Sequence, residues 1–316
     1  MRPVPTVRFA SAVFAIVFLQ GAARAQEGQR QSASDAWWTG PMLANSAATL
    51  PRGHMLVETY AFNQIQDGSS FYGSLTYLLY GVTDRFTVGA KPLVGVASSD
   101  GRTADPGMGD LTLSTQYRLT DPKAASGAPT IALSLQQSLP TGRHDRLTGY
   151  DGTALGLGTG TTTLALYGQQ LYWLPNGRIF RGRINLSGAW SGKAKVRGAS
   201  VYGTGETFRG HARPGTNFTA GVSGEYSVTR EWVLALDLVY SHSRSTRVSG
   251  RNLDEISQVE TPVSYRISAS DSLAIAPAVE YSWKPNLGVL LGTRFIPKWG
   301  STPASVTPAI AINYVH

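Results

Sequence analysis

Between Leu56 and His316 the chain repeats one pattern twelve times: about ten residues of alternating apolar and polar character, followed by a turn. An alternating strand of roughly 9–11 residues is long enough to span a bilayer, and only a closed barrel satisfies every backbone N–H and C=O group within lipid. We therefore predict an all-β fold, a transmembrane antiparallel β-barrel of about 12 strands over residues 54–316.

The predicted connections alternate between short and long, which is typical of bacterial outer-membrane barrels. The strands are expected near residues 54–63, 71–81, 85–96, 110–119, 130–139, 161–173, 180–190, 218–228, 232–241, 273–283, 287–298 and 306–316. Short turns then fall at 82–84, 120–129, 174–178, 229–231 and 284–286, and the longest loops at 140–160, 191–217 and 242–272. Because an even strand number returns both ends to the same side, we expect short periplasmic turns and long extracellular loops.

Tryptophans fall at the predicted strand ends, where the two interfacial girdles of a membrane barrel lie. Trp173, Trp232 and Trp283 are placed at periplasmic ends, and Trp190 and Trp299 at extracellular ends. A soluble β-sandwich with buried tryptophans is the alternative, but it explains neither this placement nor the alternation in loop length.

The N-terminus has the features of an export signal. Residues 1–25 combine the basic Arg2 and Arg8 with a short apolar run and a small-residue cleavage site, so we predict a signal peptide cut near Ala25 and localisation in the bacterial outer membrane. Residues 26–53 lack periodicity and are interpreted as a periplasmic N-terminal segment that could fold into the barrel mouth. The chain contains no cysteine, which excludes disulfides and thiolate metal sites.

The formal charge of +8 becomes +5 once the three arginines of the signal peptide are removed. The sequence shows no compact basic and aromatic patch of the kind that binds nucleic acid, so no nucleic-acid partner is expected. Many cations fall in the predicted outer loops: Arg143, His144, Arg146, Lys193, Lys195, Arg197, Arg209, His211, Arg213, Arg244, Arg247 and Arg251. Contact with outer-membrane lipids, lipopolysaccharide included, is the first interpretation, and electrostatic capture of anionic solutes is the second. The barrel-assembly machinery is the partner expected during biogenesis.

Charged residues also occupy positions that the alternation directs into the lumen. The pore-lining candidates are Lys91, Asp110, Arg118, Arg181, Arg183, Glu225, Asp237, Glu280 and Arg294. One interpretation is a hydrated, salt-bridged lumen, because buried charge must be paired or hydrated. The other is a selectivity ladder for carboxylates or phenolates, in which Arg181 and Arg183 share one face of a strand.

Catalysis is not expected. Ser241-His242-Ser243 lies near the predicted outer edge, but adjacent strand residues point to opposite faces and no acidic partner is evident from spacing. The glycine run at 156–160 is not followed by a helix, so it is no dinucleotide site. Histidines are scattered, and neither a metal nor a cofactor is predicted.

Several short motifs, taken in order, resemble a known family. They are Leu50-Pro51-Arg52-Gly53, Gly81-Val82-Thr83-Asp84-Arg85-Phe86, Gly107-Met108-Gly109-Asp110-Leu111, Ser138-Leu139-Pro140-Thr141-Gly142 and Gly156-Leu157-Gly158-Thr159-Gly160. Over about residues 50–316 the chain resembles the outer-membrane barrels of the MetA pathway of phenol degradation. Unlike many such barrels, it ends in Tyr314-Val315-His316, without an aromatic last residue.

The resemblance implies an uptake channel and leaves the solute open. We therefore expect an outer-membrane channel or facilitated transporter for small organic solutes, aromatic or hydrophobic ones among them. The alternatives are a structural or receptor-type closed barrel that transports nothing and, as a minor option, an outer-membrane lipid hydrolase.

Overall fold

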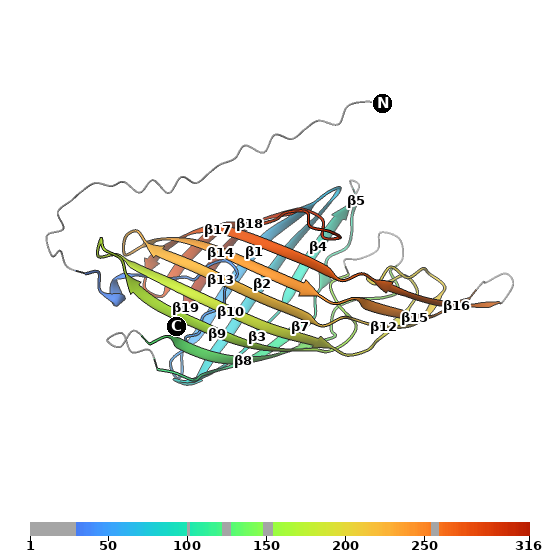
Figure 1. Cartoon of the computed structure of the whole chain (residues 1–316), viewed down its shortest axis with the longest axis horizontal. Helices are drawn as coiled ribbons and strands as arrows, with labels where there is room; N and C mark the ends of the chain where they lie inside the picture. Colours follow the sequence, from blue (N-terminus) through green and yellow to red (C-terminus); the bar gives the residue numbers. More distant parts are fainter. Residues whose placement is uncertain (1–29, 100–101, 122–127, 148–153, 254–258) are drawn as a thin grey trace, which may run out of the picture.

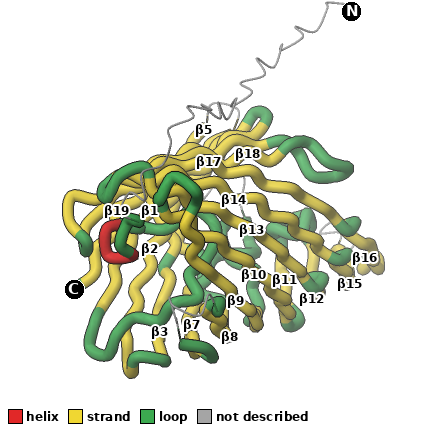
Figure 2. Tube along the Cα trace, turned by 60° about the vertical axis from the view of Figure 1, so that its left-hand side comes forward, coloured by secondary structure: helices red, strands yellow, loops and turns green. Residues whose placement is uncertain are grey.

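The chain forms a closed antiparallel β-barrel of twelve strands (Figures 1 and 2). The computed structural model describes residues 30–99, 102–121, 128–147, 154–253 and 259–316. The predicted signal peptide and its cleavage site lie outside the described residues. Among those residues, no helix is long and apolar enough to cross a membrane.

Each wall strand pairs with its neighbour in the sequence, and β1 pairs with both β2 and β19, which closes the barrel. The wall consists of β1 (Met55–Gln66), β2 (Ser69–Thr83), β3 (Phe86–Lys91) with β4 (Leu93–Ser99), β7 (Leu111–Arg118), β8 (Thr130–Leu139), β9 (Thr161–Trp173), β10 (Ile179–Ser191), β13 (Asn217–Ser227), β14 (Trp232–Ser243), β17 (Ser270–Lys284), β18 (Leu287–Ile296) and β19 (Ser305–Val315). Two short strands, β5 (Arg102–Thr103) and β6 (Gly107–Met108), extend the pairing of β4. The prediction of twelve strands is confirmed.

One predicted strand is divided in the structure. Residues 85–96 were expected to form a single strand, but β3 ends at Lys91 and β4 begins at Leu93. Pro92, which lies between them, has no N–H to give to a ladder, although its carbonyl still accepts a hydrogen bond from Thr76 N (3.1 Å). Both pieces pair with β2, so they form one wall strand with a break.

The two ends of the barrel differ as predicted. At one end, the turn end, the connections are short; the turn at residues 174–178 is tight, and Gly177 has a φ of +77°. At the other end, the loop end, the connections include residues 140–160, 192–216 and 244–269. The latter two were expected to be loops, but they contain β11 (Ala194–Arg197), β12 (Phe208–Arg213), β15 (Thr246–Leu253) and β16 (Glu260–Ile267), which form a second, four-stranded sheet.

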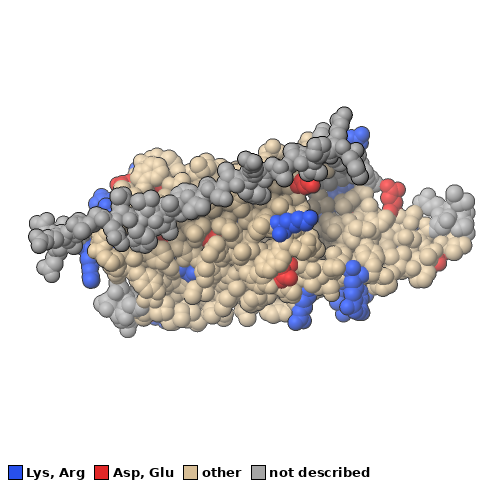
Figure 3. All heavy atoms as spheres, turned by 45° about the horizontal axis from the view of Figure 1, so that its top comes forward, with Lys and Arg blue, Asp and Glu red and all other residues tan. Residues whose placement is uncertain are grey.

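Apolar residues cover the outer face of the wall. In β14, Leu234, Leu236 and Leu238 are exposed, whereas the alternate residues Val233 and Asp237 are buried. In the part of the barrel wall visible in Figure 3, the middle carries few charged side chains. This is the reverse of a soluble β-sandwich, whose large apolar residues lie inside.

Four of the five tryptophans predicted to mark strand ends are exposed: Trp190, Trp232, Trp283 and Trp299. Trp173 is different, because its indole Nε1 donates to the carbonyl of Gln31 (2.9 Å) and belongs to the inward face of β9. Its assignment to a girdle was therefore wrong. The parity of the strand already places Trp173 inward, with Ala165 and Tyr167, whereas its partner, a backbone group of the aperiodic N-terminal segment, could not be predicted.

Candidate functional site in the barrel lumen

Residues 39–50, here called the lumen segment, follow the inner wall from β17 to β3. The segment begins on β17, where the backbone N–H groups of Thr39 and Gly40 donate to Glu280 Oε2 (2.8 and 3.1 Å). It continues past β14, where the N–H groups of Leu43 and Ala44 donate to the carboxylate of Asp237 (3.0 and 3.2 Å). Both carboxylates are fully buried. Backbone donors satisfy both oxygens of Asp237 and Oε2 of Glu280, whereas among the described residues Glu280 Oε1 has no hydrogen-bond partner.

The rest of the segment is bound by neutral polar side chains. Asn45 N donates to Asn185 Oδ1 (2.6 Å), and Asn185 Nδ2 donates back to the Asn45 carbonyl (3.1 Å). Gln116 Nε2 donates to the carbonyl of Ser46 (3.0 Å), and Leu50 N donates to Thr87 Oγ1 (3.0 Å). The interpretation of this stretch as a segment folded into the barrel mouth is the option that the structure shows.

Arg181 and Arg183 are adjacent on the inward face of β10, as predicted, and share one carboxylate. Arg181 Nε and Arg183 Nε both donate to Glu225 Oε2, at 2.6 and 2.9 Å. Glu225 lies on β13 directly opposite Arg181 and is fully buried. Arg183 also donates to the carbonyl of Ala44 (3.1 Å), and the Arg181 guanidinium lies 4.4 Å from the centre of the Trp38 ring. These contacts correspond to the salt-bridged interpretation of the lumen.

The other four candidates are dispersed. Lys91 donates to Gln136 Oε1 (3.0 Å) and lies 5.0 Å from the centre of the Tyr77 ring. Arg118 lies at the turn end, where it donates to the carbonyl of Asp84 (3.0 Å). Asp110 lies at the loop end and accepts from backbone N–H groups of the 140–160 loop. Whether these residues line a conducting path stays a prediction.

Arg294, the last of the pore-lining candidates, lies on β18 and contacts neutral polar side chains. Its Nη2 donates to Gln64 Oε1 (3.1 Å) and Thr307 Oγ1 (3.2 Å), and among the described residues its buried Nε has no hydrogen-bond partner. No ion pair joins Arg294 to a carboxylate within the described chain. This guanidinium therefore retains donor capacity toward a bound anion.

Beside Arg294 lies an aromatic cavity of about 360 Å³, which the sequence analysis missed. The lumen segment contributes Met42 and Leu43, and β1, β2 and β4 contribute Tyr60, Phe62, Phe71, Leu75, Tyr77 and Leu93. Phe62 and Phe71 are in ring contact, with centroids 5.8 Å apart. The inward position of these rings follows from the sequence, because Tyr60 and Phe62 alternate with outward residues. The predicted pore-lining residues, however, were charged ones only.

The histidine of the Ser-His-Ser run does have an acidic neighbour, contrary to what spacing indicated. On the outward face at the loop end, His242 Nδ1 lies 2.9 Å from Asp271 Oδ1, which also accepts from the Tyr240 hydroxyl (2.6 Å). Asp271 lies 29 residues further along the chain, on the neighbouring strand β17, so only the pairing of strands brings it close. Within the described residues no serine hydroxyl is hydrogen-bonded to His242, and the cluster has the form of an interfacial polar contact next to Trp299.

Comparison with known proteins assigns the chain to a family. Residues 40–296 match the family described as "Putative MetA-pathway of phenol degradation". The chain belongs to this family. The match covers the lumen segment and all wall strands up to β18, and it confirms the resemblance found in the sequence. A search of curated proteins gave no match.

One solved structure confirms the fold of this family member. The COG4313 outer membrane channel from Pseudomonas putida F1 is 15% identical, with a TM-score of 0.64 over 87% of this chain and 100% of that chain. At this identity the likeness concerns the fold alone. The NanC porin is also matched, at 8% identity and a TM-score of 0.43 over 82% of this chain and 98% of that chain.

Proposed function

We propose that this chain is an outer-membrane channel whose turn end faces the periplasm and whose loop end faces outside. The exposed apolar band of the wall and the tryptophans at both of its ends support a position across a bilayer. The closed hydrogen-bonded wall leaves no free strand edge, which is required in lipid. The difference in connection length supports the orientation.

The solutes we propose are small organic molecules with an aromatic or apolar body. The aromatic cavity carries this proposal, since its volume of about 360 Å³ lies within the usual range for small-molecule sites. Aromatic walls favour an aromatic guest through edge and offset ring contacts. Arg294 at one side of the cavity could bind an anionic substituent on the ring.

Permeation of benzenesulfonate tests the solute class, because its permanent charge prevents it from crossing lipid unaided. We expect the refolded protein to admit benzenesulfonate in preference to methanesulfonate into liposomes. Replacing Phe62 and Phe71 together with alanine should lower that preference by about two- to tenfold, the range of aromatic pair energies.

The outward-facing Phe218, exposed to lipid in the proposed orientation, offers a matched control, and Phe218→Ala should leave the preference unchanged. If the Phe62 and Phe71 variant admitted benzenesulfonate and methanesulfonate in the same ratio as the parent, the aromatic cavity would not lie on the permeation path.

One observation favours the second candidate, a closed barrel that transports nothing. The lumen segment contacts wall residues from β17 round to β3, so it occupies a large part of the cross-section near the turn end. A channel therefore conducts either through the cavities beside the segment or after the segment moves. If liposomes containing the refolded protein swelled with none of the solutes tested, the closed barrel would be favoured.

A further inference from the structure

The four-stranded sheet at the loop end extends beyond the barrel from the wall strands β10, β13, β14 and β17. Ala189 pairs with Asn217 in the wall, and five residues further on each strand Ala194 pairs with Ala212 in the sheet. Likewise β15 and β16 keep the register of β14 and β17, because Ser243 pairs with Ser270 and Thr246 with Ile267. The pairing register is thus the same on both sides of residues 192–193, 214–216, 244–245 and 268–269, which belong to no strand.

One face of this four-stranded sheet is apolar and covered. Ala194, Val196, Phe208, Ala212 and Val248 are completely or almost completely buried there beneath Tyr202. Burial raises the pKa of the Tyr202 hydroxyl to about 12, and this hydroxyl donates to the carbonyl of Leu157. This side of the sheet is thus sealed by protein.

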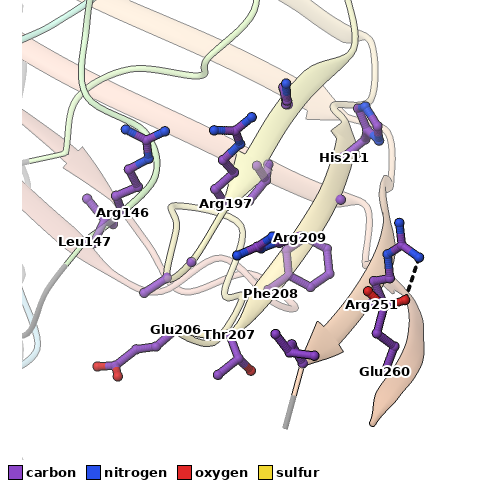
Figure 4. Close-up of a pocket in the computed structure, with 16 residues that line it drawn as sticks. Arg146, Leu147, Arg197, Glu206, Thr207, Phe208, Arg209, His211, Arg251 and Glu260 are labelled. Carbon is purple, nitrogen blue, oxygen red and sulfur yellow. Dashed lines mark hydrogen bonds and ion pairs between the residues drawn. The ribbon is translucent and has the colours of Figure 1, made fainter. Parts of the chain in front are cut away.

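The opposite face is strongly cationic, and most of its side chains are exposed. We call it the basic face, and it consists of Lys195, Arg197, Arg209, His211, Arg213, Arg247, Arg251 and Arg266. Figure 4 shows part of it, with Arg197, Arg209, His211 and Arg251 on neighbouring strands and Arg146 from the 140–160 loop beside them. Burial, together with the charges of Lys193 and Lys195, lowers the pKa of the His211 imidazole.

Cations lie directly opposite one another on this face. Arg209 pairs across the ladder with both Arg197 and Arg251, and Arg247 pairs with both Arg213 and Arg266. Like charges at opposed positions destabilise a sheet. Among the described residues, the ion pair of Arg251 with Glu260 (2.6 Å) is the only one that neutralises a member of the basic face.

The cations surround two hollows. The first, of about 790 Å³, is lined by the cations Arg146, Lys195, Arg197, Arg209, His211 and Arg251 and also by Glu206 and Glu260. The second, of about 520 Å³, lies nearer the barrel and is lined by Lys193, Arg213, Arg244, Arg247 and Arg266. No carboxylate of the described chain lines the second hollow, whereas in the lumen Arg181 and Arg183 share Glu225.

We propose that the basic face binds soluble organic anions bearing two or more carboxylate or phosphate groups, as the first site on their way into the lumen. The proposal rests on the proposed channel function and places charge selection at the mouth, not at Arg181 and Arg183. Paired rows of guanidinium groups suit a multivalent anion, since each carboxylate or phosphate can accept bidentate hydrogen bonds. Lipopolysaccharide, the first interpretation of these cations from sequence, carries the same phosphate and carboxylate groups, and the experiment below distinguishes it from a soluble anion.

Direct binding tests the proposal independently of transport. The probe is trimesate, an aromatic tricarboxylate, titrated calorimetrically into the refolded chain in micelles free of lipopolysaccharide. We expect trimesate to bind more tightly than phloroglucinol, an uncharged aromatic of similar size. Its affinity should fall as salt is raised, because screening weakens exposed charge interactions. A barrel that binds trimesate but conducts nothing would contradict the channel function alone.

The decisive variant replaces Arg213 and Arg247 together with glutamine. Losing two charge-assisted contacts should weaken trimesate binding by at least about tenfold. Replacing Arg52 and Arg178, which lie at the turn end, removes the same charge and should leave the affinity unchanged. The Arg213 and Arg247 variant should also melt no lower than the parent at low salt, because it relieves like-charge repulsion.

Equal trimesate affinity in the parent and in the Arg213 and Arg247 variant would overturn the proposal. If that variant also lost the lipopolysaccharide that the parent retains during membrane extraction, the basic face would be a lipid site.

Discussion

The lumen carboxylates show how single residues can be buried as charges in this barrel. Glu225 is bonded to two guanidinium groups, whereas Asp237 and Glu280 are bonded to backbone N–H groups of the lumen segment. A buried charge without such partners would carry a large desolvation cost. The three carboxylates therefore have two structural tasks, which are to neutralise the arginines and to hold the segment.

Glu225→Gln tests the first of these tasks. The substitution leaves Arg181 and Arg183 without their shared anion, and breaking a buried ion pair in this way costs about 3–5 kcal/mol of unfolding free energy. Urea unfolding in lipid vesicles measures it. Glu206→Gln, at an exposed position between β11 and β12, is the control and should change stability by less than about 0.5 kcal/mol. Equal unfolding midpoints for the two variants would mean that Glu225 contributes no net stabilisation.

At the scale of strands, alternation in the sequence determines which face of the wall each residue occupies. Leu236 is 45% exposed on the outer face, while its neighbour Asp237 is fully buried within the lumen. A shift of one residue would exchange these two faces. The outer face near the middle of β14 is therefore a sensitive place to test the register.

Leu236→Arg should destabilise the barrel by roughly 2–4 kcal/mol, the cost of a charge near the bilayer midplane. Leu236→Ala removes the side chain without adding charge and should cost less. Reversible folding into vesicles measures both. If arginine proved no more costly than alanine, Leu236 would be in contact with water.

Much of the wall could be predicted from sequence because apolar and polar residues alternate along its strands, as the outward and inward faces do. The break at Pro92 and the inward position of Trp173 were also open to prediction, because proline has no N–H for the ladder and Trp173 shares the parity of the inward Ala165 and Tyr167. Only the partner of Trp173, a backbone carbonyl of the aperiodic N-terminal segment, could not be predicted. The four-stranded sheet of β11, β12, β15 and β16, here called the outer sheet, was not predicted. Small residues such as Ala194 and Ala212 contribute to its apolar face, and their alternation with cationic residues was interpreted as a charged loop. In the lumen, the charged positions followed from parity, but their partners came from the aperiodic lumen segment, whose path no periodicity predicts.

Protease cleavage of intact cells tests both the outer sheet and the proposed orientation. A broadly specific protease should cut at the exposed Gly203, Gly205 or Glu206, between β11 and β12, and should spare β12 and β15, which are hydrogen-bonded to each other. The turns at 228–231 and 285–286 should stay intact because they face the periplasm in the proposed orientation. Rapid cleavage at those turns in intact cells would reverse the orientation.

For the whole molecule, the outer sheet extends from the barrel wall at the loop end, and the lumen segment lies inside the wall (Figure 1). The basic face therefore lies at the loop end. The aromatic cavity and the lumen segment lie together within the barrel, because Met42 and Leu43 of the segment line the cavity. In the proposed channel, anions would be concentrated first at the basic face, and aromatic bodies would then be selected beside the segment, which limits the passage.

Planar-bilayer conductance of the refolded chain tests the central claim, a channel partly filled by its own N-terminal segment. We expect discrete ion steps from the parent and larger steps when Asp237 and Glu280 are both replaced by alanine, because the backbone of the segment then loses its charged acceptors. Absence of steps from both proteins, with each shown to be folded by its heat-dependent mobility on gels, would contradict the claim and identify a closed barrel.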